Sequence, residues 1–311
     1  MSTTKAHKRR HARRAWEAVV IYLVLAAVGA TMVVPLIWMV STSLKTPDQL
    51  FVYPPRWVPN PATASNYRDV WTALPFARGF TNSVIVALLI VAGQVGTCSL
   101  AAYGFARMRF PLRDQLFLGY LATLMIPGAV TMIPVFIMLK MMPGALNTLL
   151  HTNIMSGDVY FLKHYAGKLV GIDSYFALIA PGCFSAYGTF LLRQFFMSVP
   201  SELEDAAKID GCTRFGVFRS IFLPLSKPAL ATLVTFTFLG AWRSFMWPLV
   251  VTSSMEMRTL PVMLQAFQSQ YYTEWSMLMA ASVIALVPAV VIFVACQRYF
   301  VAGIQLGALK G

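Results

Sequence analysis

Apolar residues in this chain occur in long blocks rather than at the alternating or helical spacing of a soluble fold. The clearest block runs from Ala18 to Val40 without a charged residue. At about 1.5 Å per residue, such a block is long enough to cross the roughly 30 Å hydrocarbon core of a bilayer. The pattern predicts an all-α integral membrane protein with six transmembrane helices, at residues 18–40, 83–106, 115–139, 175–193, 228–252 and 275–297.

The distribution of positive charge predicts the orientation of these helices. Lys and Arg total sixteen in segments 1–17, 107–114, 193–227 and 298–311, and eight in the connections on the other side. The positive-inside rule therefore places both ends in the cytoplasm, with 1–17 as a basic N-terminus beside anionic lipid and 298–311 as a tail. Although the net charge is +13, no folded basic surface accompanies it, so we expect no nucleic-acid partner. The first apolar block is too long for a signal-peptide core, so we expect it to be retained.

Two connections on the external side are long. Residues 41–79 form a predicted external loop rich in proline, and residues 141–173 form a second one, with some helical character expected near 158–169. Prolines also interrupt the predicted spans, where each removes a backbone donor and favours a kink. Because a freed carbonyl needs a partner in lipid, we expect the kinked helices to pack against one another or a wet cavity. These prolines are Pro35, Pro127, Pro134, Pro181, Pro248 and Pro288.

The polar segment 198–225, between the fourth and fifth spans, predicts two short helices with a turn. Ser201 and Glu204 fit a capping box at the start of the first helix. Asp210-Gly211 supplies a stop, since glycine tolerates the left-handed conformation that ends helices. In the second helix Phe215, Phe218 and Phe222 have the spacing of one helical face. The small side chains of Ala206 and Ala207 suit insertion into a groove of another protein, and an ordinary solvated loop helix is the open alternative.

Segment 198–225 resembles the EAA loop of ABC importer permeases. The family pattern is Glu-Ala-Ala, three residues, Gly, nine residues, then Ile-x-Leu-Pro. Here Asp205-Ala206-Ala207 is followed at that spacing by Gly211 and by Ile221, Leu223 and Pro224, with Asp205 where the family usually has Glu. Further segments are similar to the sugar-permease branch, and residues 141–168 look like an insertion in it. These segments include Asn82-Ser83, 102–107, Trp247-Pro248-Leu249, 258–261 and the terminal 307–311.

The resemblance implies a type I ABC importer permease fold, closest to the six-span maltose-transporter type, with a core domain at 80–297. It also implies a non-enzymatic subunit that moves a sugar or oligosaccharide by alternating access. The expected partners are a second permease, two copies of a cytoplasmic ATPase and an extracytoplasmic substrate-binding protein. No phosphate-binding loop of the form G-x-x-x-x-G-K-[ST] occurs, so ATP and Mg are expected on the ATPase. The implied docking residues are Glu204, Asp205, Ala206, Ala207, Gly211, Ile221, Leu223 and Pro224.

Candidate substrate contacts lie in the second and fifth spans. Arg243 follows Trp242 where the family more often has Asn, and an arginine at this depth costs at least about 2.5–3.5 kcal/mol unless it faces water or a partner. One hypothesis is that Arg243 lines the path and bonds substrate hydroxyls or an anionic group. The alternatives are pairing with an acid on the second permease, or snorkelling outward. Gln94 and Tyr103 also qualify, although single polar residues in membrane helices often serve interhelical hydrogen bonds.

Other functional classes have less support in the sequence. A stand-alone secondary transporter or channel remains an alternative, but we detect no inverted repeat in the hydropathy. The four histidines, His7, His11, His151 and His164, have no metal-ligand spacing. A membrane enzyme is disfavoured because the predicted spans hold no cluster of histidines or carboxylates. An ABC importer for a non-sugar solute, such as a glycerol phosphodiester, also remains open.

Overall fold

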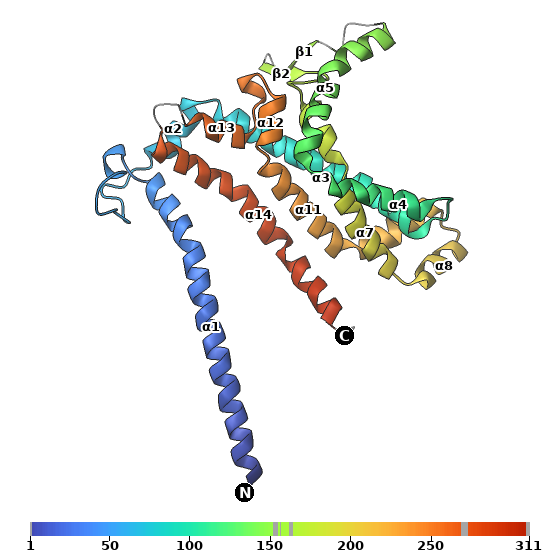
Figure 1. Ribbon diagram of the computed structural model, residues 1–311, viewed down its shortest axis with the longest axis horizontal. Helices are drawn as coiled ribbons and strands as arrows, with labels where there is room; N and C mark the ends of the chain where they lie inside the picture. The colour runs from blue at the N-terminus through green and yellow to red at the C-terminus, as the bar shows by residue number, and fades with distance from the viewer. Residues whose placement is uncertain (1, 152–154, 156, 162–163, 269–272, 309–311) are drawn as a thin grey trace. The chain divides into compact units, whose positions relative to one another are not determined.

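The computed structural model describes residues 2–151, 155, 157–161, 164–268 and 273–308, and most of these residues are helical (Figure 1). The α-helices are α1 (Ser2–Ser43), α2 (Ser65–Ala73), α3 (Phe76–Arg107), α4 (Arg113–Ala122), α5 (Gly128–Leu150), α6 (Tyr175–Ile179), α7 (Ala186–Ser198), α8 (Ser201–Ile209), α9 (Arg214–Val217), α10 (Leu223–Leu225), α11 (Lys227–Trp242), α12 (Met246–Val251), α13 (Leu260–Ala266) and α14 (Trp275–Ala308). Shorter helical turns are η1 (Pro47–Gln49), η2 (Thr123–Met125), η4 (Ala180–Cys183), η6 (Met255–Met257) and the π-helix η5 (Phe218–Phe222).

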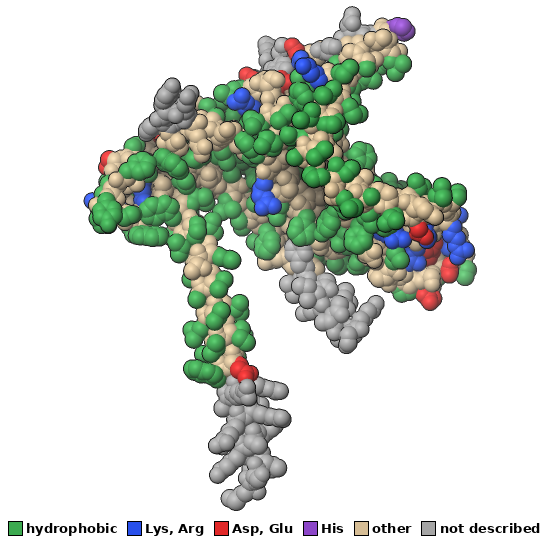
Figure 2. All heavy atoms as spheres, viewed as in Figure 1, with side chains coloured by type: hydrophobic (Ala, Val, Ile, Leu, Met, Phe, Trp, Pro, Cys, Tyr) green, Lys and Arg blue, Asp and Glu red, His purple; other side chains and the backbone are tan. Residues whose placement is uncertain are grey.

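The chain divides into two compact units, one of residues 1–70 and 267–284 and the other of residues 71–266 and 285–311. In the first unit, large apolar side chains are exposed along α1 between Trp16 and Val40, and Figure 2 shows them on one face of the helix. The segment after α1 is held to it by Asn66, whose Nδ2 donates to Ser43 O at 2.8 Å and to Lys45 O at 3.0 Å. The predicted external loop 41–79 thus contains ordered elements.

The second unit is built around α3, which packs against α7 and α11. Glycines allow α3 to approach η4 closely and α7 to approach α11 closely. A Cβ atom at Gly93 would lie 2.4 Å from Cys183 Sγ and 2.9 Å from Cys183 Cβ, and one at Gly188 would lie 2.8 Å from Leu233 Cδ1. Close approach through small residues is the usual source of van der Waals packing between helices in lipid.

Five described helices are long and apolar enough to cross a membrane, and the bent pair 214–225 and 227–242 would make a sixth. The predicted third span, 115–139, is wrong as one helix. The backbone becomes extended at Ile126, because a residue before proline avoids the helical conformation, and the long apolar helix is α5, which begins after Pro127. The predicted spans 175–193 and 228–252 are interrupted as well, by η4 and by residues 243–245.

A small hairpin departs from the all-α expectation. Strands β1 (Asp158–Phe161) and β2 (His164–Lys168) pair antiparallel where helical character was expected near 158–169, so that expectation was wrong. The segment is rich in Val, Tyr and Phe, which favour strands. The part of the presumed insertion before the hairpin, 141–150, extends α5.

The glycine contacts predict a sharp size limit at the α3–η4 crossing. We expect Gly93→Ala to lower the free energy of unfolding by about 1–3 kcal/mol, because the new methyl group overlaps Cys183 and the packed helices must shift. Gly96→Ala, three residues away on the same helix, meets no atom within 4 Å and serves as the control. Thermal unfolding of both variants in detergent would measure the difference, and equal midpoints would contradict the close packing.

Candidate functional site

The predicted polar loop 198–225 forms α8, a turn, α9, the π-helix η5 and α10. The predicted stop is present: Gly211 has φ +81°, and the N–H of Cys212 donates to Ala207 O at 2.9 Å. The predicted capping box is wrong. Ser201 lies inside α8, whose N-cap is Pro200 with no side-chain hydrogen bond, and the Glu204 carboxylate turns instead toward two cations.

The two alanines of this segment lie on different faces of α8. Ala207 is buried in the cluster formed by α3, α7 and η5, whereas Ala206 is exposed. Asp205 and Ile209 are exposed with Ala206, and Ile209 keeps 86% of its surface. On the outward surface of α8, Ala206 therefore has only a small side chain, and Ile209 presents an exposed apolar one.

The predicted face of three phenylalanines is only partly formed. Phe218 and Phe222 are buried, but Phe215 remains 62% exposed, although its ring centroid lies 5.9 Å from that of Phe218. The π-helical turn from Phe218 changes the spacing of the side chains after α9, so a uniform helical period does not apply. Ile221 and Leu223 pack against the same cluster, while Pro224 is exposed.

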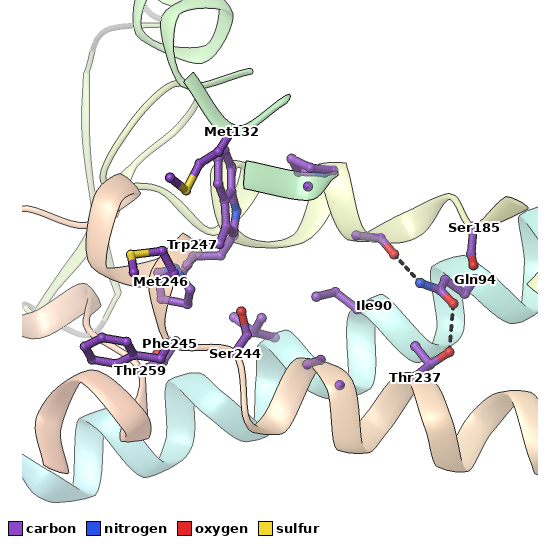
Figure 3. A pocket seen from close by; sticks show the side chains of 18 of the residues that line it. Ile90, Gln94, Met132, Ser185, Thr237, Ser244, Phe245, Met246, Trp247 and Thr259 are labelled. Atoms are coloured by element: carbon purple, nitrogen blue, oxygen red, sulfur yellow. Dashed lines mark hydrogen bonds between the residues drawn. The ribbon is translucent and has the colours of Figure 1, made fainter. Parts of the chain in front are cut away.

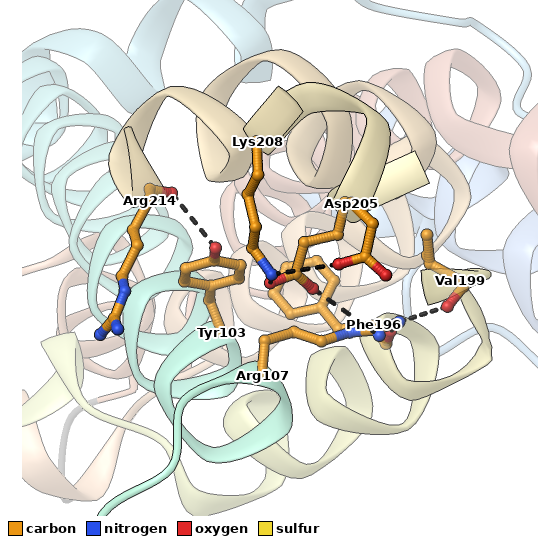
Figure 4. A network of polar contacts seen from close by, with 8 residues as sticks. Tyr103, Arg107, Phe196, Val199, Asp205, Lys208 and Arg214 are labelled. Atoms are coloured by element: carbon orange, nitrogen blue, oxygen red, sulfur yellow. Dashed lines mark hydrogen bonds and ion pairs between the residues drawn. The ribbon is translucent and has the colours of Figure 1, made fainter. Parts of the chain in front are cut away.

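A polar network joins α8 to the ends of α3 and α7 (Figure 4). The Nη2 atom of Arg107, the last residue of α3, donates to Phe196 O at 2.7 Å and also to Val199 O. Its Nη1 atom lies 3.8 Å from Glu204 Oε2, and Lys208 Nζ lies 3.0 Å from Glu204 Oε1. The hydrogen bonds of Lys208 to Glu204 and then Asp205 raise the pKa of Lys208.

Tyr103 belongs to this network rather than to a cavity. Its hydroxyl donates to Arg214 O at 3.2 Å, and its ring centroid lies 5.3 Å from that of Phe218 and 5.2 Å from that of Phe222. The sequence offered Tyr103 as a substrate-path candidate, and this side chain instead ties α3 to the loop. Charged side chains gather around α8 in Figure 2, where the loop forms the polar end of the second unit.

A cavity of about 850 Å³ lies between α3, α5, α7 and α11 (Figure 3). Three interruptions of regular helix contribute to its wall: the start of α5 at Gly128, the turn at Pro181-Gly182 and the break at Ser244-Phe245. Irregular backbone at membrane depth is tolerated where it is buried in protein or lines a wet cavity. The described side chains of the wall are all uncharged, with Trp247 and Tyr187 among them.

Gln94 is the substrate-path candidate that the structure places in this wall. Its Nε2 atom donates to Gly182 O at 2.8 Å, and its Oε1 atom accepts from Thr237 Oγ1 at 2.7 Å (Figure 3). Gln94 on α3 therefore connects the break at η4 to α11. Neither Thr237 nor Trp247 was predicted to line the substrate path, although Pro248, which follows Trp247, was expected to kink this span.

The other two candidates lie outside the described wall of the cavity. Trp242 is buried, donates to Ala285 O at 3.0 Å and stacks on Phe238 with ring centroids 5.6 Å apart. Arg243 ends α11, is exposed and donates from Nε to Leu239 O at 3.1 Å. Within the described residues no group of three or more His, Cys, Asp or Glu side chains could hold a metal ion.

The sequence matches one family model over residues 94–305, described as the binding-protein-dependent transport system inner membrane component. The chain is 34% identical over 254 residues to the arabinooligosaccharides transport system permease AraQ of Halalkalibacterium halodurans, which covers 81% of each protein. It is 33% identical over 265 residues to the sn-glycerol-3-phosphate transport system permease UgpE of Yersinia pestis, covering 83% of this chain and 85% of that one.

The fold also matches a solved structure. A chain of a bacterial ABC transporter involved in the import of the acidic polysaccharide alginate superimposes with a TM-score of 0.74 at 19% identity. The match covers 92% of this chain and 97% of the other. At this identity the match shows that the two chains share a fold.

Proposed function

The chain belongs to the family of binding-protein-dependent inner membrane transport components, and from this premise we propose that it imports a sugar or oligosaccharide through the cavity described above. As a multi-pass permease of an ABC importer, it contributes the membrane passage. The proposal on substrate is supported by the similarity to an arabinooligosaccharide permease and by a mainly apolar, uncharged cavity wall that also carries aromatic and polar side chains. The similarity to a glycerol-3-phosphate permease keeps a phosphate-bearing glycerol derivative as a second candidate.

The observation that carries the coupling proposal is the outward surface of α8. Ala206 leaves this surface low, and Asp205 and Ile209 flank it with one charge and one exposed apolar side chain. Such a surface suits insertion into a groove of another protein. We propose that a separate cytoplasmic ATPase docks at this surface and hydrolyses ATP with Mg. The complete importer contains two copies of this ATPase, and this chain itself catalyses no reaction. Glu204 supports the loop from inside, because its carboxylate is occupied by Lys208 and Arg107.

A bulky residue at Ala206 tests the docking proposal. We expect Ala206→Trp to reduce the amount of ATPase that co-purifies with the tagged permease by at least about tenfold, equivalent to about 1.4 kcal/mol, since the indole would hold the groove away from α8. Ala206→Ser keeps the surface low and should retain the ATPase. Both side chains point away from the core, so both variants should fold. Equal recovery of the ATPase with Trp and Ser would contradict docking at this face.

The proposed function also implies an orientation in the membrane and further partners. We propose that α8 and both chain ends face the cytoplasm, and that an extracytoplasmic binding protein delivers the substrate to the other side. We also propose that a second permease completes the passage. The positive-inside distribution of Lys and Arg supports this orientation.

Cys212 provides a native probe of the orientation, because it is exposed in the turn after α8. A membrane-impermeant maleimide should label it in inside-out vesicles and not in intact spheroplasts, both prepared from cells that lack the ATPase. Cys212→Ser should remove this labelling, since Cys98 is buried and Cys183 and Cys296 are only partly accessible. Labelling of Cys212 from the outside would overturn the assignment.

The cavity proposal predicts that substitutions at Gln94 and Arg243 have different effects on uptake. Gln94→Leu preserves volume but removes hydrogen bonds to Gly182 and Thr237, each worth about 0.5–1.5 kcal/mol, so we expect sugar uptake to fall about tenfold. Arg243→Ala alters a side chain outside the wall and should leave uptake within about twofold.

Uptake of a radiolabelled sugar, normalised to the amount of assembled complex, makes this comparison. Uptake lost in Arg243→Ala with the complex intact would restore Arg243 as a substrate contact. Loss of the second permease from that variant would instead identify an intersubunit ion pair.

A further inference from the structure

At the adjoining ends of α3 and α7, an arginine of each helix bonds to backbone carbonyls of the other. Arg107 of α3 donates to Phe196 O and Val199 O at the end of α7, and Arg193 of α7 donates from Nε to Phe105 O at 3.3 Å on α3. The last carbonyls of a helix have no intrahelical partner, and a cation there also complements the helix dipole. Each guanidinium therefore supplies hydrogen bonds to terminal carbonyls of the other helix, and these bonds hold the two helix ends together.

Arg107 makes one further link, to α8. Only Val199 and Pro200 separate α7 from α8, and Arg107 contacts the backbone at the first of these residues and the Glu204 side chain beyond them. The side chains of Arg107 and Glu204 are 14% and 13% exposed, so this ion pair is shielded from water more than a surface pair. The guanidinium also lies 5.0 Å from the ring centroid of Phe222, which anchors η5.

Helix α3 continues from this junction to the cavity without interruption. Arg107 and Gln94 are thirteen residues apart on α3, which corresponds to about 20 Å along a helix. Gln94 is bonded there to the break at Gly182 and to Thr237 of α11. One rigid element thus carries the anchor of α8 at one end and a polar link in the cavity wall at the other.

We propose that Arg107 is a positioning residue that transmits displacement of α8 to α3, and through α3 to the cavity wall at Gln94. Arg107 has no part in binding the ATPase or the substrate. Loss of its guanidinium should separate ATP hydrolysis from transport while the ATPase stays attached. The inference rests on the proposed function, because it requires α8 to be the segment that a separate ATPase moves.

The test uses the complete importer in proteoliposomes, with its binding protein, and compares Arg107→Gln with Arg109→Gln. Arg109 is exposed in the connection to α4, two residues away, so the control removes the same charge from the same region. We expect Arg107→Gln to keep a normal amount of co-purified ATPase and to transport about five- to tenfold fewer substrate molecules per ATP hydrolysed. Arg109→Gln should match the wild type in both measurements.

Glu204→Gln provides a second variant that does not depend on the folding of Arg107→Gln. It removes the charge that pairs with Arg107 but leaves the bonds of Arg107 to Phe196 and Val199 in place. Its ratio of transport to hydrolysis should fall by a smaller factor, and the double variant should be no worse than Arg107→Gln alone, because contacting residues in one network are not additive.

The outcomes are distinct. An unchanged ratio of transport to hydrolysis in both variants, or loss of the ATPase together with transport, would overturn the positioning role of Arg107. Failure of the wild-type chain to retain any ATPase would instead overturn the proposed function. A lowered ratio with the ATPase retained supports the transmission of movement through α3.

Discussion

A bilayer offers no water to pair with a backbone N–H or C=O group, so every such group needs a partner within the protein. Helix α3 meets this requirement for its neighbours. Its side chains donate to carbonyls freed where the fourth span is interrupted and where it ends: Gln94 to Gly182 at 2.8 Å, Thr97 to Cys183 at 2.6 Å and Arg107 to Phe196 at 2.7 Å. At the other end of α3, Asn82 donates to Glu256 O at 2.7 Å. The break at Pro181-Gly182 in the cavity wall is therefore stabilised by a continuous helix, which supplies partners for its freed carbonyls.

The sequence predicted the membrane spans well where composition alone decides them. A helix of about twenty apolar residues crosses a bilayer whatever its neighbours are, and the spans near 18–40, 83–106 and 275–297 all lie within single helices. The sequence marked Pro127 and Pro248 as kinks but did not predict that helices end at 126–127 and 243–245, since prolines inside α1, α5 and α14 do not end those helices. Whether a proline ends or only bends a helix depends on tertiary partners that the sequence does not reveal.

The candidate site shows the same division between local pattern and tertiary contact. The glycine turn at 211 follows from local backbone preference and could be predicted, whereas the inward turn of Glu204 depends on Arg107, nearly one hundred residues earlier in the chain. Arg107 itself resembles an ordinary charge at the end of a span, and its pairing with α7 carbonyls needs the packed structure. The contacts of Tyr103 with the loop could not be predicted for a related reason, since the sequence does not separate the side of a helix that faces a cavity from the side that faces another helix.

The contrast between α3 and its neighbours bears on how movement passes through the molecule. Over 32 residues α3 contains no proline, while the backbone around the cavity is irregular at 180–183 and at 243–245. A regular helix moves as a rigid body, because each turn is held by hydrogen bonds to the next. Irregular backbone absorbs a displacement through changes in a few φ and ψ angles. In the proposed transmission, displacement that enters α3 at Arg107 reaches Gln94 and is taken up at the break that Gln94 contacts. The same hydrogen bonds that make the broken helices tolerable in lipid thus also connect them to the loop.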